Sequence, residues 1–129
     1  HPLTMIASDG RLVVPGDGHP HPRWYGTFPR VLGYFVREKK TLSLEEAVYK
    51  MSLLPAQTIG IKNRGLIKKG MYADITIFDK NTIIDKATFE SPHQYSEGIY
   101  YVLVNGEIAI DNGEFKNIKA GVVLKKNAP

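Results

Sequence analysis

The chain has 129 residues, 43% of them hydrophobic and 23% charged, which is ordinary for a globular protein with a core. Seventeen basic and 13 acidic residues give a formal net charge of +4, but the basic residues are scattered, which argues against a nucleic-acid surface. The chain has no cysteine, which excludes a disulfide framework or a thiolate site in these residues.

The sequence gives no sign of a membrane or secretion signal. No apolar run approaches the roughly 20 residues that span a bilayer. The first residues, HPLTMIASDG, lack the basic region and the long apolar region of a signal peptide. We therefore expect a soluble, cytoplasmic protein, and a chain that begins with histidine predicts a missing upstream portion.

Residues 3–8 (LTMIAS) form an apolar run that predicts a short buried strand. The stretch from Gly10 to Thr27 holds too many glycines and prolines for regular structure and predicts a loop. Apolar residues at helical spacing from Phe28 to Val36 then predict an amphipathic helix that ends near the charged residues 37–40.

Two shorter helices are predicted next. Ser43 and Glu46 have the spacing of a capping box, which predicts the start of a helix at the following apolar residues. Pro55 should end that helix and begin a short one over residues 55–59, and Gly60 should end it.

After Gly60 the pattern changes to short strands. Strands are predicted over residues 73–79, 99–104, 107–110 and 121–124. Asn105-Gly106 is the preferred dipeptide for a two-residue type I′ hairpin, and Asn112-Gly113 marks another turn. The chain therefore divides near residue 62, into a part with loop and helices and a part with antiparallel strands.

Asp9 is a candidate catalytic residue. It ends the first predicted strand, and Gly10 lets the backbone turn sharply after it. In α/β barrels the reactive groups lie at the carboxyl ends of strands. A carboxylate there can take a proton from an activated water and pass it to a leaving group. The alternative is that Asp9 only caps a turn or the next helix, and spacing alone favours this simpler role.

Arg23 is a candidate substrate-binding residue. It lies between a proline and two aromatics, Trp24 and Tyr25, and a guanidinium matches a carboxylate with two parallel hydrogen bonds. The alternative is a surface arginine stacked on an aromatic ring. His19 and His21 do not have the spacing of helical or zinc-finger ligands, so we interpret them as loop residues and assign no metal ligand.

The stretch HPHPRWYGTFPRVLG, with SDG before it, closely resembles the C-terminal part of D-aminoacylases, the N-acyl-D-amino-acid deacylases of the amidohydrolase superfamily. The later piece GMYADITIFD is similar to amidohydrolase endings in general, and the resemblance covers nearly the whole chain. It implies an α/β fold. Residues 1–61 would be the last unit of a (β/α)₈ barrel, and residues 62–129 would be the C-terminal share of a small β-sandwich.

The resemblance also implies roles for two residues. Asp9 matches the family's aspartate at the end of barrel strand eight, which activates a zinc-bound water and then protonates the departing amine. Arg23 matches the arginine of the HPR motif, which binds the substrate's α-carboxylate. The implied reaction is zinc-dependent hydrolysis of a small N-acyl-D-amino acid, with the zinc ligands mainly upstream of this chain.

A complete barrel needs roughly 250 residues, so we expect this segment alone to be inactive. Helix faces meant to pack on a barrel would then favour self-association, through residues such as Phe28, Phe35 and Met51. The segment RLVVPGDG after Gly10 looks longer than in D-aminoacylases, which leaves the acyl group open. Two further hypotheses stay open: a cyclic amidohydrolase of the dihydroorotase or allantoinase type, and a non-catalytic β-sandwich or oligomerisation module.

Overall fold

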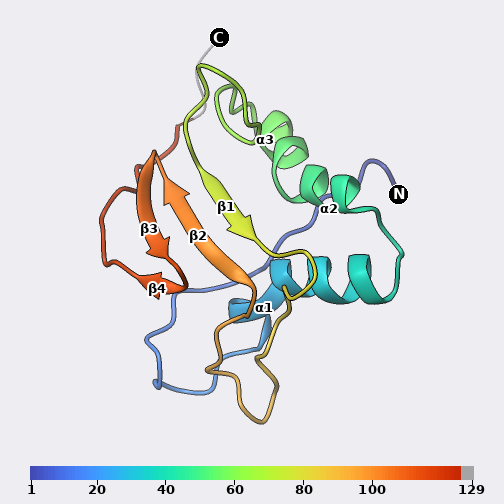
Figure 1. The fold of residues 1–129 in the computed structure, drawn as a ribbon, viewed down its shortest axis with the longest axis vertical. Helices are drawn as coiled ribbons and strands as arrows, with labels where there is room; N and C mark the ends of the chain where they lie inside the picture. The colour runs from blue at the N-terminus through green and yellow to red at the C-terminus, as the bar shows by residue number, and fades with distance from the viewer. Residues whose placement is uncertain (126–129) are drawn as a thin grey trace. The chain divides into compact units, whose positions relative to one another are not determined.

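The computed structural model describes residues 1–125 and has a mixed fold of helices and one antiparallel sheet (Figure 1). Its segments interleave in two compact units. One unit combines residues 1–5 and 48–78 with the chain from Ile99 onward, and the other combines residues 6–47 and 79–98. Within residues 1–125, no helix has both the length and the apolar character that crossing a membrane requires.

The first helix, α1 (Arg23–Arg30), begins five residues before the predicted start at Phe28. Pro22 occupies the N-cap in helical conformation, with φ −51° and ψ −29°, and a proline is already set for a helix start. The ring Nδ1 of His21 accepts a hydrogen bond from the Arg23 N–H at 3.1 Å. These two residues extend the helix toward the N-terminus, so the predicted loop ends at Pro22.

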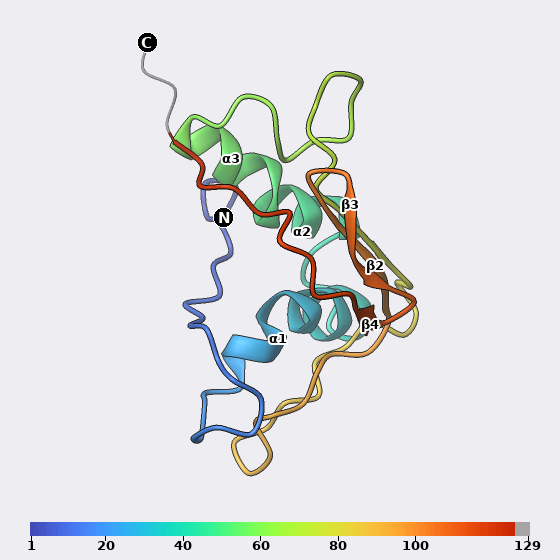
Figure 2. The same cartoon turned by 90° about the vertical axis from the view of Figure 1, so that its left-hand side faces the viewer.

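α1 continues directly into a stretch of π-helix, η1 (Val31–Glu38), as Figure 2 shows. Pro29 lies inside α1 and has no N–H to donate to the carbonyl of Tyr25, four residues earlier. The Ser96 hydroxyl donates to that carbonyl instead, at 3.3 Å. A side chain from a distant part of the chain thus replaces the helical bond that proline removes.

The α1–η1 helix packs closely against residues 83–85 at two glycines, Gly26 and Gly33. A Cβ added at Gly26 would lie 2.5 Å from the Asp85 Cβ, and one at Gly33 would lie 2.5 Å from the Ile83 carbonyl oxygen. Ile83 is 1% exposed. The two glycines, seven residues apart, let the helix approach closely.

The capping box predicted at Ser43 is confirmed. The Ser43 hydroxyl accepts from the Glu46 N–H at 3.1 Å, and the Glu46 carboxylate accepts from the Ser43 N–H at 3.0 Å. The helix that follows is α2 (Leu44–Met51), and Ala47 on it is fully buried.

The short helix α3 (Leu53–Ile59) is also confirmed, although it begins two residues before Pro55. Pro55 therefore lies in the first turn, where a missing N–H costs no helical hydrogen bond. Gly60 ends the helix in the left-handed conformation, with φ 83°, as the sequence predicts.

The sheet contains four antiparallel strands in chain order (Figure 1). The strands are β1 (Ile75–Phe78), β2 (Ile99–Val104), β3 (Glu107–Asp111) and β4 (Glu114–Phe115). Asn105 and Gly106 both have positive φ, 51° and 87°, which is the signature of the predicted type I′ hairpin. The second predicted turn, at Asn112-Gly113, joins β3 to the short β4.

Two predicted strands, residues 3–8 and 121–124, are irregular instead. A strand needs a neighbour for its ladder of hydrogen bonds, and no described segment pairs with residues 3–8. Leu3, predicted to be buried, is 80% exposed. Two carbonyls of this region bond to the Lys50 ammonium instead, those of His1 at 2.6 Å and Thr4 at 2.8 Å.

Candidate active site

The structure brings the two candidate site residues together. A carboxylate oxygen of Asp9 lies 2.6 Å from a terminal nitrogen of Arg23. The Arg23 Nε–H also donates to the Asp9 carbonyl oxygen, at 3.3 Å. Both side chains face solvent, with 82% of the Asp9 side chain and 43% of the Arg23 side chain exposed. Because exposed ion pairs contribute little to stability, this pair is free to exchange partners with a charged ligand.

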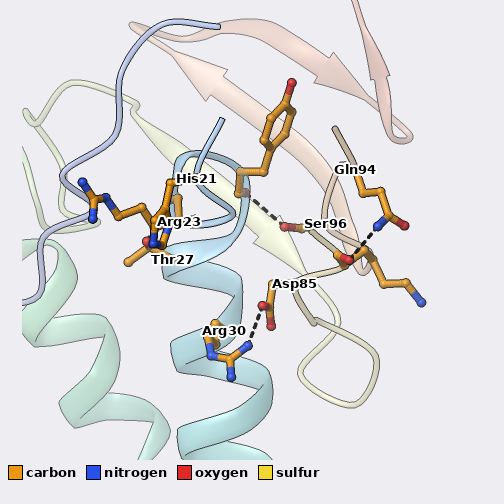
Figure 3. A network of polar contacts seen from close by, with 9 residues as sticks. His21, Arg23, Thr27, Arg30, Asp85, Gln94 and Ser96 are labelled. Carbon is orange, nitrogen blue, oxygen red and sulfur yellow. Dashed lines mark hydrogen bonds and ion pairs between the residues drawn. The ribbon is translucent and has the colours of Figure 1, made fainter. Parts of the chain in front are cut away.

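The local sequence sets both positions. Asp9 has φ 46°, in the left-handed region, which aspartate tolerates better than most residues. The Ser8 hydroxyl accepts from the Gly10 N–H at 3.2 Å and turns the chain away from the apolar run. Arg23 opens α1, and the Thr27 hydroxyl donates to its carbonyl at 2.9 Å (Figure 3).

The histidines of the loop between these residues pack against a distant segment. His19 places its Nε2 2.6 Å from the Phe89 carbonyl oxygen. The ring of His21 lies edge-on to the Phe89 ring, with 4.9 Å between centroids. Both histidines therefore have contacts that hold the loop in place. Within residues 1–125, His, Asp and Glu side chains nowhere gather in a group of three that could hold a metal ion.

Phe89 and His93, in the 79–98 segment, contact the loop between Asp9 and Arg23, and sequence reasoning missed them. His93 contacts the backbone at Gly16 and Gly18 and the hydroxyl of Tyr25 in α1. Asp85 pairs with Arg30 at 2.9 Å, and only 10% of its side chain is exposed (Figure 3). This segment has neither helical nor strand periodicity. Its only signal is a lone histidine between a proline and a glutamine.

The electrostatics of Tyr25 favour a protonated hydroxyl. Burial raises the pKa of Tyr25, and the neighbouring Tyr95 raises it further. The two rings meet edge to face, 5.7 Å apart. Tyr25 therefore keeps its proton and acts as a hydrogen-bond donor toward His93.

Asp74, in the other unit, has a structural role. Burial pushes its pKa upward, but the Asn105 N–H at 2.8 Å and the Arg64 guanidinium together lower the pKa of this carboxyl below its ordinary value. The Arg64 guanidinium also lies over the Tyr72 ring, 4.3 Å from its centroid. This cluster fixes the start of β1 to the Asn105 hairpin.

The family model described as "Amidohydrolase family" matches residues 3–110. The chain is 49% identical over 106 residues to N-acyl-D-glutamate deacylase of Alcaligenes xylosoxydans xylosoxydans, which covers 82% of this chain and 21% of that protein. It is 45% identical over 125 residues to the D-aminoacylase of the same organism, and this match covers 97% of this chain and 25% of that protein. Similarity to a dihydroorotase of Lactobacillus gasseri is weaker, with 36% identity over 90 residues. This match covers 61% of this chain and 21% of that protein.

Two solved structures are similar along most of the chain. A crystal structure of D-aminoacylase matches with a TM-score of 0.82 and 45% identity, covering 89% of this chain and 24% of that one. The N-acyl-D-glutamate deacylase of Bordetella bronchiseptica, complexed with zinc and a phosphonate mimic of the tetrahedral intermediate, matches with a TM-score of 0.78 and 46% identity, covering 84% and 22%. The chain thus spans about a quarter of the length of these relatives.

Proposed function

Because the chain belongs to the amidohydrolase family, we propose that the protein of which it forms a part is a zinc-dependent hydrolase of N-acyl-D-amino acids. The products are a carboxylate and a free D-amino acid. The observation that carries this proposal is the placement of Asp9 beside Arg23, 2.6 Å apart on an exposed loop. The pair offers a proton carrier and a carboxylate-binding group at one point of the surface.

Arg23 binds the substrate. A guanidinium pairs with the α-carboxylate of an N-acyl-amino acid through two hydrogen bonds, as it now pairs with the Asp9 carboxylate. An incoming carboxylate therefore competes with Asp9 for the same donors. Substrate binding frees the Asp9 carboxylate at the moment when the reaction needs it.

Asp9 moves the proton. Its carboxylate takes a proton from the attacking water and delivers it to the nitrogen of the departing amine. Both transfers need a carboxylate that reaches solvent and substrate, and the Asp9 side chain is largely exposed. The simpler role of Asp9 as a turn cap does not require the nearby guanidinium.

The zinc belongs mainly to the part of the protein outside this chain. Residues 1–125 do not form a metal site by themselves, because they contain no group of three His, Asp or Glu side chains that could hold a metal ion. Zinc polarises carbonyl groups and makes water more acidic. The complex of the Bordetella bronchiseptica deacylase with zinc supports the same metal here.

We assign residues 1–61 to the last unit of a (β/α)₈ barrel and residues 62–129 to the C-terminal share of a β-sandwich. The match to about a quarter of the D-aminoacylase structure supports this division, as does the change from helices to an antiparallel sheet after α3. The unpaired run at residues 3–8 also fits, because a barrel strand takes its hydrogen bonds from two neighbouring strands.

The test uses the full-length zinc enzyme and measures amine release from N-acetyl-D-amino acids with acidic and with apolar side chains. The L enantiomers are the matched controls, and dihydroorotate tests the cyclic-amidohydrolase alternative that the Lactobacillus gasseri similarity favours. We expect hydrolysis of the D substrates alone. Hydrolysis of dihydroorotate without D-deacylation would contradict the proposal.

A further inference from the structure

We infer that His93 is a positioning residue, which fixes the 10–22 loop to α1 and so sets where Arg23 meets the substrate. The effect on substrate binding rests on the proposed deacylase function. The claim that His93 holds the loop against α1 does not. His93 lies in the 79–98 segment and touches neither Asp9 nor Arg23. It acts through the loop between them.

His93 joins two parts of the chain through both ring nitrogens. Its Nδ1 lies 2.9 Å from the Tyr25 hydroxyl and 3.3 Å from the Gly16 nitrogen. Its Nε2 lies 3.1 Å from the Gly18 carbonyl oxygen. Gly16 and Gly18 have φ of 86° and 65°, so this turn of the loop has a shape that favours glycine. The ring thus ties the turn to the first helical turn of α1.

The partners of the ring fix one neutral tautomer. A carbonyl oxygen only accepts, so the Nε2 facing Gly18 carries the proton. The Gly16 N–H only donates, so Nδ1 is the acceptor. The Tyr25 hydroxyl lies 2.9 Å from the same nitrogen and donates to it. Every polar atom of the ring is satisfied.

The connection to Arg23 runs through two neighbouring contacts. Tyr25 follows Arg23 by two residues in the same helical turn, so a shift of Tyr25 moves the Arg23 backbone. On the loop side, His21 caps the Arg23 N–H and packs on Phe89, which belongs to the same segment as His93. His19 adds a hydrogen bond to the Phe89 carbonyl. The 79–98 segment thus holds the loop at both ends of the turn.

The role predicts a specific kinetic effect. If the ring positions Arg23, its loss weakens binding of the substrate carboxylate and leaves the proton transfer by Asp9 largely intact. We expect His93→Ala in the full-length zinc enzyme to raise KM by about tenfold with a small change in kcat, within the 100-fold that a misplacement of about 1 Å can cost. His93→Asn keeps an acceptor near the Nδ1 position and should recover part of the loss.

A double-mutant cycle separates positioning from a general loss of stability. In an Arg23→Ala background, His93→Ala should change KM by less than about twofold, because the residue through which it acts is gone. Gln94→Ala is the matched control. Its amide donates to the carbonyls of Lys86 and Ser91 and makes no hydrogen bond to the loop, so KM should not change.

Hydrogen exchange of the backbone amides tests whether His93 holds the loop, and it does not depend on an activity assay. Peptides covering residues 11–20 should exchange faster in His93→Ala and at the wild-type rate in Gln94→Ala. Unchanged exchange in His93→Ala overturns the inference, as do KM effects of His93→Ala and Arg23→Ala that simply multiply. A wild-type protein without deacylase activity would overturn the proposed function, and the exchange result would still decide whether His93 holds the loop.

Discussion

At the scale of single residues, Arg23 should govern substrate affinity. Its guanidinium pairs with the exposed Asp9 carboxylate, and an α-carboxylate can take that place. We expect Arg23→Ala to raise KM by about 10- to 100-fold, the equivalent of the roughly 1.5–3 kcal/mol of hydrogen bonds to a charged group. Arg23→Lys keeps the positive charge but loses the paired donors of the guanidinium. Its KM should lie between those of the wild type and Arg23→Ala. Unchanged steady-state kinetics on carboxylate substrates would remove Arg23 from this role.

Asp9 should govern turnover. Asp9→Asn has nearly the same shape but an amide cannot accept the proton of the attacking water, so kcat should fall by about 10²- to 10⁴-fold with a small change in KM. Circular dichroism serves as the check on folding, which we expect to be unaffected because the side chain is largely exposed. Full activity in Asp9→Asn would instead favour a role for this chain as a non-catalytic module.

Asp74 should make stability depend on pH in the acid range. Its pKa is lowered in the folded state relative to the ordinary value of 3.8, so its carboxylate stabilises the fold above that value. The contribution is lost as the pH falls below about 4, through the lowered pKa of the folded state. The free energy of unfolding, measured with urea across this pH range, should depend less steeply on pH in Asp74→Asn than in the wild type. Equal slopes would contradict the assignment.

At the scale of elements, η1 packs closely on Ile83 and Ile84 at Gly33. In most helices Gly→Ala is stabilising by about 1 kcal/mol. At Gly33 the added methyl would lie 2.5 Å from a backbone oxygen, which cannot rotate away. We expect Gly33→Ala to lower the free energy of unfolding by about 1–3 kcal/mol. Gly121→Ala, with open space around the site, is the control, and a stabilised Gly33→Ala would show that the contact is looser.

Local chemistry explains which elements the sequence could predict. The capping box at Ser43, the left-handed Gly60 and the Asn105-Gly106 hairpin each depend on residues a few positions apart, and all three are confirmed. The start of α1 was misplaced because Pro22 and the His21 ring act outside the apolar periodicity. The strand predicted at residues 3–8 is irregular, because no segment within residues 1–125 pairs with it.

In the candidate site, too, the sequence could identify some features and not others. Asp9 and Arg23 could be found because their residue types suit a proton transfer and a carboxylate, and the motif around Arg23 is specific. Their ion pair joins two residues 14 positions apart across an irregular loop. The contacts that residues 79–98 make with this loop join segments about 70 residues apart. No pattern within a single segment records such a contact. His93 became a candidate only through its neighbours in space.

At the scale of the whole molecule, the 129 residues should not act alone. They cover about a quarter of the related enzymes, and their described part contains no metal-binding group. We expect the purified segment to show no zinc-dependent deacylation. We also expect it to self-associate, because Phe28 and Phe35 remain partly exposed. Deacylation by the segment would contradict the first expectation, and a monomer in analytical ultracentrifugation would contradict the second.

Lys50 is buried, and within residues 1–125 no acidic side chain pairs with its ammonium. Its ammonium is surrounded by uncharged oxygens, the carbonyls of His1 and Thr4 and the Thr4 hydroxyl at 3.2 Å. Three acceptors suit the three protons of an ammonium ion, which makes the burial tolerable. An amine-directed reagent therefore meets the exposed lysines of the chain first. It reaches Lys50 only when residues 1–4 come away from α2, so the labelling rate of this one amine measures how often these residues detach.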